Sequence, residues 1–376
     1  MNKMNWTIQK WNDVLSIVNG KNQRDVVSDD GAYPIIGSGG EIGRATKFLC
    51  EAGATVVGRK GTINNPFFVE ERFWNVDTAF GIQPGEKLNP RFLFYFCKCF
   101  NFKKLDKSTT IPSLAKTDLL NIEMPVPSLK EQKRIVNKIE ELFSELDSAV
   151  ETLKKTKEQL AVYRQSVLKE AFESISDTSI LVNLAERIFD GPFGSNLKSI
   201  DYINEGIRVV RLENLKEGWF DDSKQSFVSI EKYESIKNHT VYPSDLIMST
   251  FISDSIKVCQ MPEYIKFAVN KADCIGIRLK EDVVEKKYVL YYLLSRKAYV
   301  DLEHQIHGAT RPRVNTTQIK QLEIPICSKK EQKKIVSQIE SRFTICENIE
   351  KTVNEALIQA DAMRQSILKK AFEGGL

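Results

Sequence analysis

A stretch that occurs twice decides the fold of this chain. EMPVPSLKEQKRIVNKIEE at 123–141 corresponds to EIPICSKKEQKKIVSQIES at 323–341, and YRQSVLKEAFES at 163–174 corresponds to MRQSILKKAFEG at 363–374. The copies lie 200 residues apart and align without a gap. Self-similarity on this scale indicates two halves, each a variable region followed by a similar tail.

Each tail is predicted to form one long helix. Ser128 and Glu131 are spaced as a capping box directly after a proline-rich junction, and Ser328 with Glu331 repeats that spacing. Apolar residues then recur at steps of four and three for more than four heptads, which is typical of a coiled-coil seam. The predicted seam residues are Ile135, Ile139, Leu142, Leu146, Leu153, Leu160, Ile335, Ile339, Ile349, Val353 and Ile367.

Each seam needs a partner, since an exposed apolar stripe of this length is unfavourable in water. The other copy in the same chain is the simplest partner. A homodimer that pairs each helix with a second molecule is the alternative.

The two copies also share polar residues that a seam does not require, among them Gln132, Arg164, Gln165 and Lys169. Two equivalent docking faces for one kind of partner would explain them, whereas helix-favouring and capping roles are the plainer explanation. A second apolar stripe on each helix either widens the core face or receives a partner. The candidate docking residues are Phe143, Arg164, Phe172, Phe343, Arg364 and Phe372.

The predicted domains are globular regions 1–127 and 181–327 and long helices 128–176 and 328–374. Both globular regions contain short β-like runs broken by glycine, followed by an aromatic, helix-like segment, so each is predicted to be α+β. The predicted strand runs are 33–40, 54–63, 67–76, 206–215, 244–251 and 273–280, and the helix-like segments are 90–100 and 286–294.

Polar loops of these regions carry the kinds of side chain that a base-reading surface would require. Guanidinium groups suit guanine, amides suit adenine, and hydroxyl and ammonium groups suit phosphates. The DNA-binding candidates are Arg59, Lys60, Thr62, Asn64, Asn65, Lys107, Ser108, Thr109, Thr110, Ser195, Asn196, Lys198, Arg208, Arg211, Asn214, Arg311 and Arg313. For any single residue, a solvated loop position is the plainer interpretation.

Composition narrows the class of protein. The chain has 376 residues, 42% hydrophobic and 28% charged residues, and a net charge of +4, values typical of a soluble globular protein that is permitted, but not required, to bind nucleic acid. No segment is long and apolar enough to span a membrane, so a cytoplasmic location is expected. Seven cysteines without CxxC spacing favour buried thiols, and HxxH at 304–307 lacks an acidic partner, so no metal site is expected.

The sequence contains none of the enzyme motifs considered next in complete form. GSGGEIG at 37–43 has its third glycine one position late for a dinucleotide loop, no Walker sequence occurs, and NNPF at 64–67 lacks the first proline of an amino-methyltransferase signature. No catalytic residue is therefore assigned.

The junction sequences at 109–136 and 310–336, together with GPFGSNLKSIDY at 191–202, resemble the specificity subunits of type I restriction-modification systems. The second junction departs from the pattern, with Cys327 where the first has Pro127. The resemblance implies two target-recognition domains, each reading one half of a split double-stranded DNA site, separated by two long antiparallel coiled-coil helices with pseudo-twofold symmetry.

The same resemblance implies a non-catalytic subunit on which two methyltransferase subunits dock, with restriction subunits joining through them. S-adenosylmethionine, ATP and magnesium would then be bound by those partners and not by this chain. Two alternatives from other classes stay open: a coiled-coil interaction scaffold that does not bind DNA, and an orphan adenine methyltransferase. Non-specific DNA binding at low salt and binding of S-adenosylmethionine to the isolated chain distinguish them.

Overall fold

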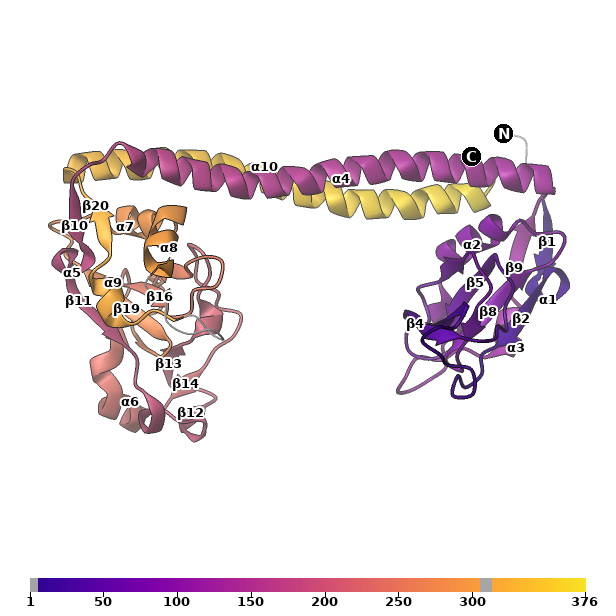
Figure 1. The fold of residues 1–376 in the computed structure, drawn as a ribbon, viewed down its shortest axis with the longest axis horizontal. Helices are drawn as coiled ribbons and strands as arrows, with labels where there is room; N and C mark the ends of the chain where they lie inside the picture. The colour runs from indigo at the N-terminus through magenta and orange to yellow at the C-terminus, as the bar shows by residue number, and fades with distance from the viewer. Residues whose placement is uncertain (1–5, 305–312) are drawn as a thin grey trace. The chain divides into compact units, whose positions relative to one another are not determined.

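The computed structural model describes residues 6–304 and 313–376. The chain divides into two compact units, Met1–Lys154 with Val353–Leu376, and Lys155–Thr352. Each unit holds one globular domain and a part of both long helices (Figure 1). We call the globular part of the first unit domain 1 and that of the second unit domain 2.

Domain 1 is a mixed structure of short strands and helices. Its sheets have the orders β2-β8-β5-β6, β4-β3-β7 and β1-β9, and all pairs are antiparallel except β3 with β7. The strands are β1 (Thr7–Lys10), β2 (Leu15–Asn19), β3 (Tyr33–Gly37), β4 (Gly40–Ala45), β5 (Ala54–Gly58), β6 (Phe67–Val69), β7 (Trp74–Asn75), β8 (Ala79–Pro84) and β9 (Glu123–Val126). The helices are α1 (Trp11–Val14), α2 (Pro90–Cys99) and α3 (Lys116–Leu120), with a 3-10 turn at Phe102–Leu105.

The core of domain 1 lies between α2 and the four-stranded sheet. Strand β5 is buried at every position, as expected for a central strand. Helix α2 begins at a proline behind Asn89, whose side chain accepts a hydrogen bond from the Phe92 N–H. Trp11 is fully buried and makes edge contacts with Phe96 and Phe102 at 6.3 and 6.2 Å between ring centroids.

Domain 2 has the same plan with larger insertions. Its sheets have the orders β11-β19-β16-β17, β12-β14-β13-β18-β15 and β10-β20. The strands are β10 (Thr178–Ile180), β11 (Ala185–Asp190), β12 (Tyr202–Ile203), β13 (Ile207–Val210), β14 (Phe227–Val228), β15 (Thr240–Val241), β16 (Leu246–Ser249), β17 (Val258–Gln260), β18 (Ala268–Asn270), β19 (Cys274–Leu279) and β20 (Glu323–Pro325). The helices are α5 (Leu181–Leu184), α6 (Ile230–Ile236), α7 (Lys286–Leu293), α8 (Arg296–Glu303) and α9 (Thr316–Lys320).

The two domains are equivalent in topology although their sequences have diverged. The order β2-β8-β5-β6 recurs as β11-β19-β16-β17, and the parallel pair β3 with β7 recurs as β13 with β18. A buried asparagine follows in both: the Asn75 side chain donates to the Ala79 carbonyl at 3.1 Å, and the Asn270 side chain donates to the Cys274 carbonyl at 2.8 Å. These bonds close the same turn into the next strand.

The two tails form single helices, α4 (Leu129–Glu173) and α10 (Lys329–Phe372). In the second copy the capping box is complete, because the Glu331 N–H donates to Ser328 Oγ and the Ser328 N–H donates to Glu331. In the first copy the Glu131 N–H donates to Ser128 Oγ, while the Glu131 carboxylate instead receives two hydrogen bonds from Arg134. Cys327 in place of proline therefore does not shift the start of the second helix.

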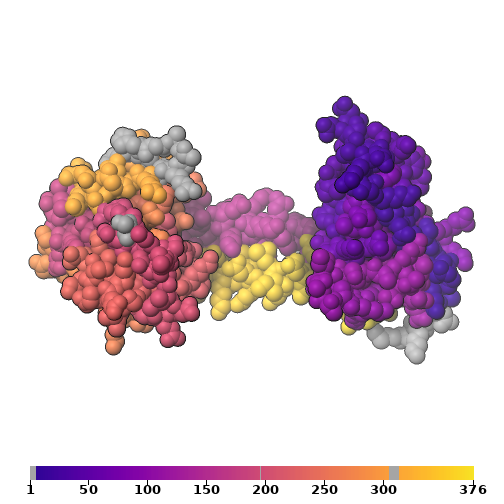
Figure 2. Space-filling model, turned by 90° about the horizontal axis from the view of Figure 1, so that it is seen from below, coloured from indigo at the N-terminus to yellow at the C-terminus, as the bar shows by residue number. Residues whose placement is uncertain are grey.

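The helices run antiparallel within each unit. In the first unit Arg134 donates to the carbonyl of Leu376 at 2.7 Å, and Arg364 pairs with Asp147. In Figures 1 and 2 the C-terminal segment of α10 (yellow) lies along α4 (magenta). The structure therefore shows the expected pairing inside one chain.

The second unit shows the same antiparallel arrangement. Arg342 contacts Glu170 at 2.5 Å, and Arg164 contacts Glu350 at 2.9 Å. Four charged side chains thus link the helices across their seam in this unit.

Burial refines the predicted seam. Ile135 and Ile139 are fully buried in the core of domain 1, and Ile339 is buried in that of domain 2, so the first turns of each helix pack on a domain. Ile349 is 40% exposed, and its assignment to the seam is wrong because the neighbouring Glu350 turns inward to Arg164. The other predicted seam residues are buried or half-buried: Leu142, Leu146, Leu153, Leu160, Ile335, Val353 and Ile367.

Other expectations concern cysteines, metals and membranes. All seven cysteines are free, and five of them are buried. Within the described residues, none of the helices has the length and apolar character that crossing a bilayer requires. The same residues hold no cluster of three or more metal-type ligands; His304 follows the end of α8, and His307 lies outside the described range.

Candidate DNA interface

In domain 1 the structure brings two of the predicted polar stretches together. One follows β5 and begins at Arg59; the other precedes α3. The Leu114 N–H donates to the Arg59 carbonyl and the Gly61 N–H to the Pro112 carbonyl, both at 2.9 Å, and Lys60 forms a β-bridge with Ser113. Residues more than 50 positions apart in the sequence thus form one two-loop surface.

Several candidate side chains on this surface already have partners that shape the loops. Asn64 accepts the Phe102 N–H at 2.7 Å, and Asn65 accepts from Lys98 at 3.3 Å. Lys107 pairs with Asp118 at 2.9 Å. These contacts fix the loops while the side chains of Asn64, Asn65 and Lys107 stay at the surface, as do those of Lys60, Thr62, Thr109 and Thr110.

Asp106 organises the second loop. Its carboxylate accepts hydrogen bonds from the Ser108 hydroxyl, the Ser108 N–H and the Ser113 N–H, at 2.6 to 3.1 Å. These bonds hold the pKa of Asp106 below its usual value, because they stabilise the charged form. Ser108 therefore serves the conformation of the loop in addition to any contact with DNA.

Domain 2 carries an equivalent two-loop surface. The Val314 N–H donates to the Thr250 carbonyl at 2.9 Å, and Arg313 forms a β-bridge with Phe251, which matches the contacts of Leu114 with Arg59 and of Ser113 with Lys60. Thr250 also donates through its N–H to the Asp273 carbonyl at 3.0 Å. Arg313 is thus at the site, while Arg311 lies outside the described residues.

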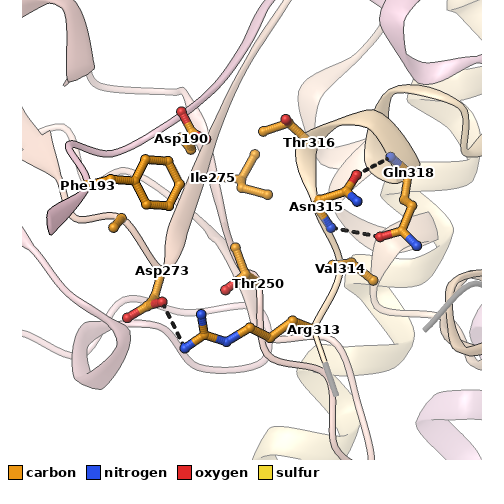
Figure 3. Close-up of a pocket in the computed structure, with 11 residues that line it drawn as sticks. Asp190, Phe193, Thr250, Asp273, Ile275, Arg313, Val314, Asn315, Thr316 and Gln318 are labelled. Carbon is orange, nitrogen blue, oxygen red and sulfur yellow. Dashed lines mark hydrogen bonds and ion pairs between the residues drawn. The ribbon is translucent and has the colours of Figure 1, made fainter. Parts of the chain in front are cut away.

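The segment with Asn196 and Lys198 lies near this surface. Phe193 lines one cavity with Thr250, Asp273 and Arg313, shown in Figure 3. The side chains of Asn196 and Lys198 are exposed, and Ser195 lies in the 3-10 turn Gly194–Asn196. The segment that carries these three candidates therefore begins beside the two-loop surface of domain 2.

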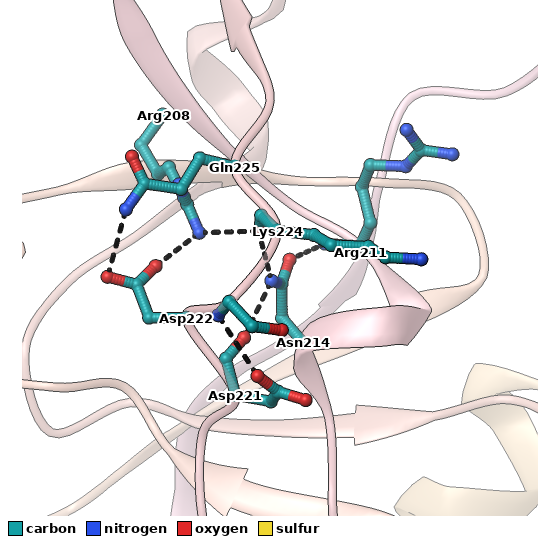
Figure 4. A network of polar contacts seen from close by, with 8 residues as sticks. Arg208, Arg211, Asn214, Asp221, Asp222, Lys224 and Gln225 are labelled. Atoms are coloured by element: carbon teal, nitrogen blue, oxygen red, sulfur yellow. Dashed lines mark hydrogen bonds and ion pairs between the residues drawn. The ribbon is translucent and has the colours of Figure 1, made fainter. Parts of the chain in front are cut away.

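Arg208 and Asn214 are corrections, because both are buried. Arg208 is 7% exposed and pairs with Asp222, and Asn214 is 2% exposed. The Asn214 amide donates to the carbonyls of Asp221 and Lys224 at 2.8 and 2.9 Å (Figure 4). Both side chains close a loop of domain 2, and their burial leaves little of their surface for contact with a base.

Arg211 belongs to the same region but is only half-buried. Its guanidinium points away from the network in Figure 4 and lies 5.4 Å from the centre of the Tyr202 ring. It also contacts Glu213 at 3.6 Å. It remains a candidate, on the second sheet of domain 2 and not on the two-loop surface.

Sequence reasoning missed Phe251 and Asp273, which flank Arg313. Hydrophobic patterning assigned Phe251 to a strand, and Asp273 to the start of another. The signal that finds them is a second repeat with a different spacing: NVDTAFGI at 75–82 corresponds to NKADCIGI at 270–277, 195 residues later. This second repeat is hard to find because insertions in domain 2 change the spacing between the copies from the 200 residues of the tails.

Comparison with known proteins gives the family. The model described as "Type I restriction modification DNA specificity domain" matches residues 3–161 and 202–359. The chain belongs to this family. Among its relatives, the StySPI specificity subunit of Salmonella potsdam is 26% identical over 315 residues, covering 78% of this chain and 67% of that protein. The EcoDI specificity subunit of Escherichia coli is 23% identical over 408 residues, covering 99% and 89%.

Solved structures show that this specificity subunit shares its fold with others. A chain from a study of complex assembly and conformational transition of the type I R-M system superposes with a TM-score of 0.75 at 17% identity, covering 99% of this chain and 98% of that one. The HsdS subunit from Thermoanaerobacter tengcongensis gives 0.57 at 18% identity, with the same coverage. The α+β architecture with two long helices is therefore confirmed.

The phenylalanines that were candidates for partner docking in this specificity subunit pack inside it. Phe172 is 6% exposed, between Tyr288 and Tyr292 at 5.1 and 5.2 Å. Phe372 contacts Phe92 and Phe96 at 5.0 and 5.4 Å. Their rings attach the C-terminal end of each long helix to a domain.

The other docking candidates also have partners within the chain. Phe143 and Phe343 make edge contacts with Tyr95 and Tyr291 at 5.8 and 5.7 Å. Arg164 and Arg364 pair across the two helices, and Arg364 also lies 5.4 Å from the centre of the Phe143 ring. All six residues thus attach the helices to the domains or to each other.

One of the shared polar residues has a clear structural role. Gln132 is fully buried, and its amide accepts the Asn89 N–H at 2.7 Å and donates to the carbonyls of Lys87 and Pro127. Gln332, also fully buried, accepts the Glu285 N–H at 2.8 Å in the same way. Asn89 and Glu285 are the N-cap residues of α2 and α7, so each glutamine joins a long helix to the aromatic helix of its domain.

Proposed function

We propose that this specificity subunit reads a two-part double-stranded DNA target, one part per domain, through the two-loop surfaces. The observation that carries the proposal is their equivalence: the same backbone contacts support Arg59, Lys60 and Ser113 in one domain and Thr250, Phe251 and Arg313 in the other. Two domains that recognise different DNA sequences would share the same backbone arrangement and differ in the side chains that it presents.

Independent reading is tested by exchanging one domain. Residues 1–109 are replaced by those of another family member, and the methylated sequence is determined in cells that carry the complete system. One half of the motif should change, because the remaining surface is untouched. A change in both halves, or in neither, would contradict modular reading.

The proposal extends to partners. Two copies of one modification subunit would bind the chain, and restriction subunits would join through them, with S-adenosylmethionine, ATP and magnesium bound by those partners. Support comes from a groove of about 700 Å³ beside the end of α4, lined by Gln165, Ser166, Lys169 and Glu173. All four residues recur 200 positions later, three in α10 and the fourth directly after its end, as two identical docking faces would require.

Native mass spectrometry of the full chain with an excess of modification subunit tests this stoichiometry. We expect two bound copies at saturation. A single copy would contradict the proposal for partners, while leaving the proposal for DNA reading in place. Equilibrium dialysis of the chain alone should detect no bound S-adenosylmethionine.

A further inference from the structure

The β-bridge that joins the two loops carries a cationic side chain in both domains, but on different sides of the bridge. Positions 60 and 113 form the bridge in domain 1, and positions 251 and 313 form it in domain 2. In domain 1 the cation is Lys60, in the first of the two loops, opposite Ser113. In domain 2 the cation is Arg313, in the second loop, opposite Phe251.

Arg313 is held on two sides. Its guanidinium carbon lies 4.2 Å from the centre of the Phe251 ring, which covers one face. Nη2 lies 3.4 Å from Asp273 Oδ1, and Figure 3 shows the side chain extended toward this carboxylate. Among the described residues, this ion pair is the polar contact made by the guanidinium, and 51% of the Arg313 side chain stays exposed.

Such a contact contributes little to stability, since an exposed ion pair is largely offset by solvent and by side-chain entropy. Its effect is on orientation. A guanidinium has five N–H donors in a rigid plane, and one nitrogen facing Asp273 leaves donors on the remaining edge. That edge matches the O6 and N7 acceptors of guanine, whereas a lysine in the same place can only present a point charge.

We propose that Arg313 recognises a guanine in the half-site read by domain 2, and that Asp273 and Phe251 position its guanidinium for this contact. The inference rests on the proposed function and adds a residue and a base to it. It also predicts asymmetry: Ser113, the equivalent residue in domain 1, cannot make a bidentate contact with guanine.

The test is selection from a pool of random DNA duplexes by the full chain purified with its modification subunits, followed by sequencing. The wild-type complex should select two specified segments separated by an unspecified gap. Arg313→Lys keeps the charge and removes the fork. We expect it to lose between about 5- and 150-fold of the preference for one guanine in one segment, with every other position unchanged. Asp273→Asn should weaken the same preference by a smaller factor.

The matched control is Arg187→Lys. Arg187 also stacks on an aromatic ring of domain 2, at 4.4 Å from the centre of the Phe189 ring, but on β11 and not among the residues that line the cavity of Figure 3 or the proposed docking groove. It should leave the motif unchanged. An unchanged motif in Arg313→Lys, or an equal loss of affinity for all sequences as a phosphate contact gives, would overturn the role of Arg313 alone. Failure of the wild-type complex to select a two-part motif would overturn the proposed function.

Discussion

At the scale of single residues, the least predictable features are buried amides. Gln132, Gln332, Asn75 and Asn270 are completely buried, yet hydrophobic patterns do not mark them. Each satisfies backbone groups that would otherwise lie unpaired in the interior, and an unpaired buried group costs about 1–3 kcal/mol. Identity between the repeats pointed to Gln132 but not to its role. A residue shared for partner docking and a residue shared for an internal hydrogen bond look the same in a sequence.

Replacing Gln132 by leucine should destabilise the first unit by about 2–4 kcal/mol, because the Asn89 N–H and the Lys87 carbonyl lose their partner. Chemical denaturation followed by circular dichroism measures the change. Gln159→Leu is the control: that side chain is exposed on the same helix, and we expect a change within about 0.5 kcal/mol. Equal effects of the two substitutions would rule out a special role for the buried amide.

At the scale of elements, periodicity and capping predicted the long helices well. The helices begin at Leu129 and Lys329, directly after the serines of the predicted capping boxes. All six predicted strand runs contain strands, because β-branched residues and glycine breaks mark them. The candidate site was harder to predict from the sequence. Each two-loop surface is formed by backbone contacts between loops that are distant in the sequence. The burial of Arg208 depends on a sheet whose strands come from separate parts of the chain.

The seam predicts how the helices respond to insertions. Seven residues added after Leu153 and after Val353 almost preserve the facing of each seam, since a heptad turns the helix by nearly two full turns. Five residues rotate it by about 140°. We expect the heptad variant to unfold within a few degrees of the wild type and the five-residue variant to unfold at a clearly lower temperature.

The same heptad variant has a second readout. It lengthens each helix by roughly 10 Å. If the helices set the gap in the DNA target, the methylated motif should gain about one to three unspecified base pairs, at roughly 3.4 Å per pair along a strand. An unchanged gap in an active complex would show that they do not set it.

At the scale of the whole molecule, each domain is completed by both long helices. The core of domain 1 contains Ile135 and Ile139 from the start of α4, and Leu368 and Ala371 from the end of α10. That of domain 2 contains Val167 and Leu168 from the end of α4, and Ile339 from the start of α10. Cutting the sequence at the junctions would therefore not give independent domains.

Leu368→Ala tests this dependence. Leu368 is 2% exposed, and its truncation should cost about 2–5 kcal/mol, although the residue lies more than 240 positions from the last strand of domain 1. Limited proteolysis should then cut domain 1 faster and leave domain 2 as resistant as before. Met363→Ala, at a 55% exposed position of the same helix, should change neither rate. Accelerated cleavage of domain 2 alone would contradict the assignment.

Because both domains need residues from both long helices, the order in which the two units can complete folding is opposite to the order in which their globular domains are synthesised. The second unit is one continuous segment, Lys155–Thr352, whereas the first must wait for Val353–Leu376. At about 5–20 residues per second, Leu368 is made on the order of 10–50 s after Ile139. The domain that is synthesised first is thus completed last, and during that interval its apolar face is exposed to chaperones and proteases.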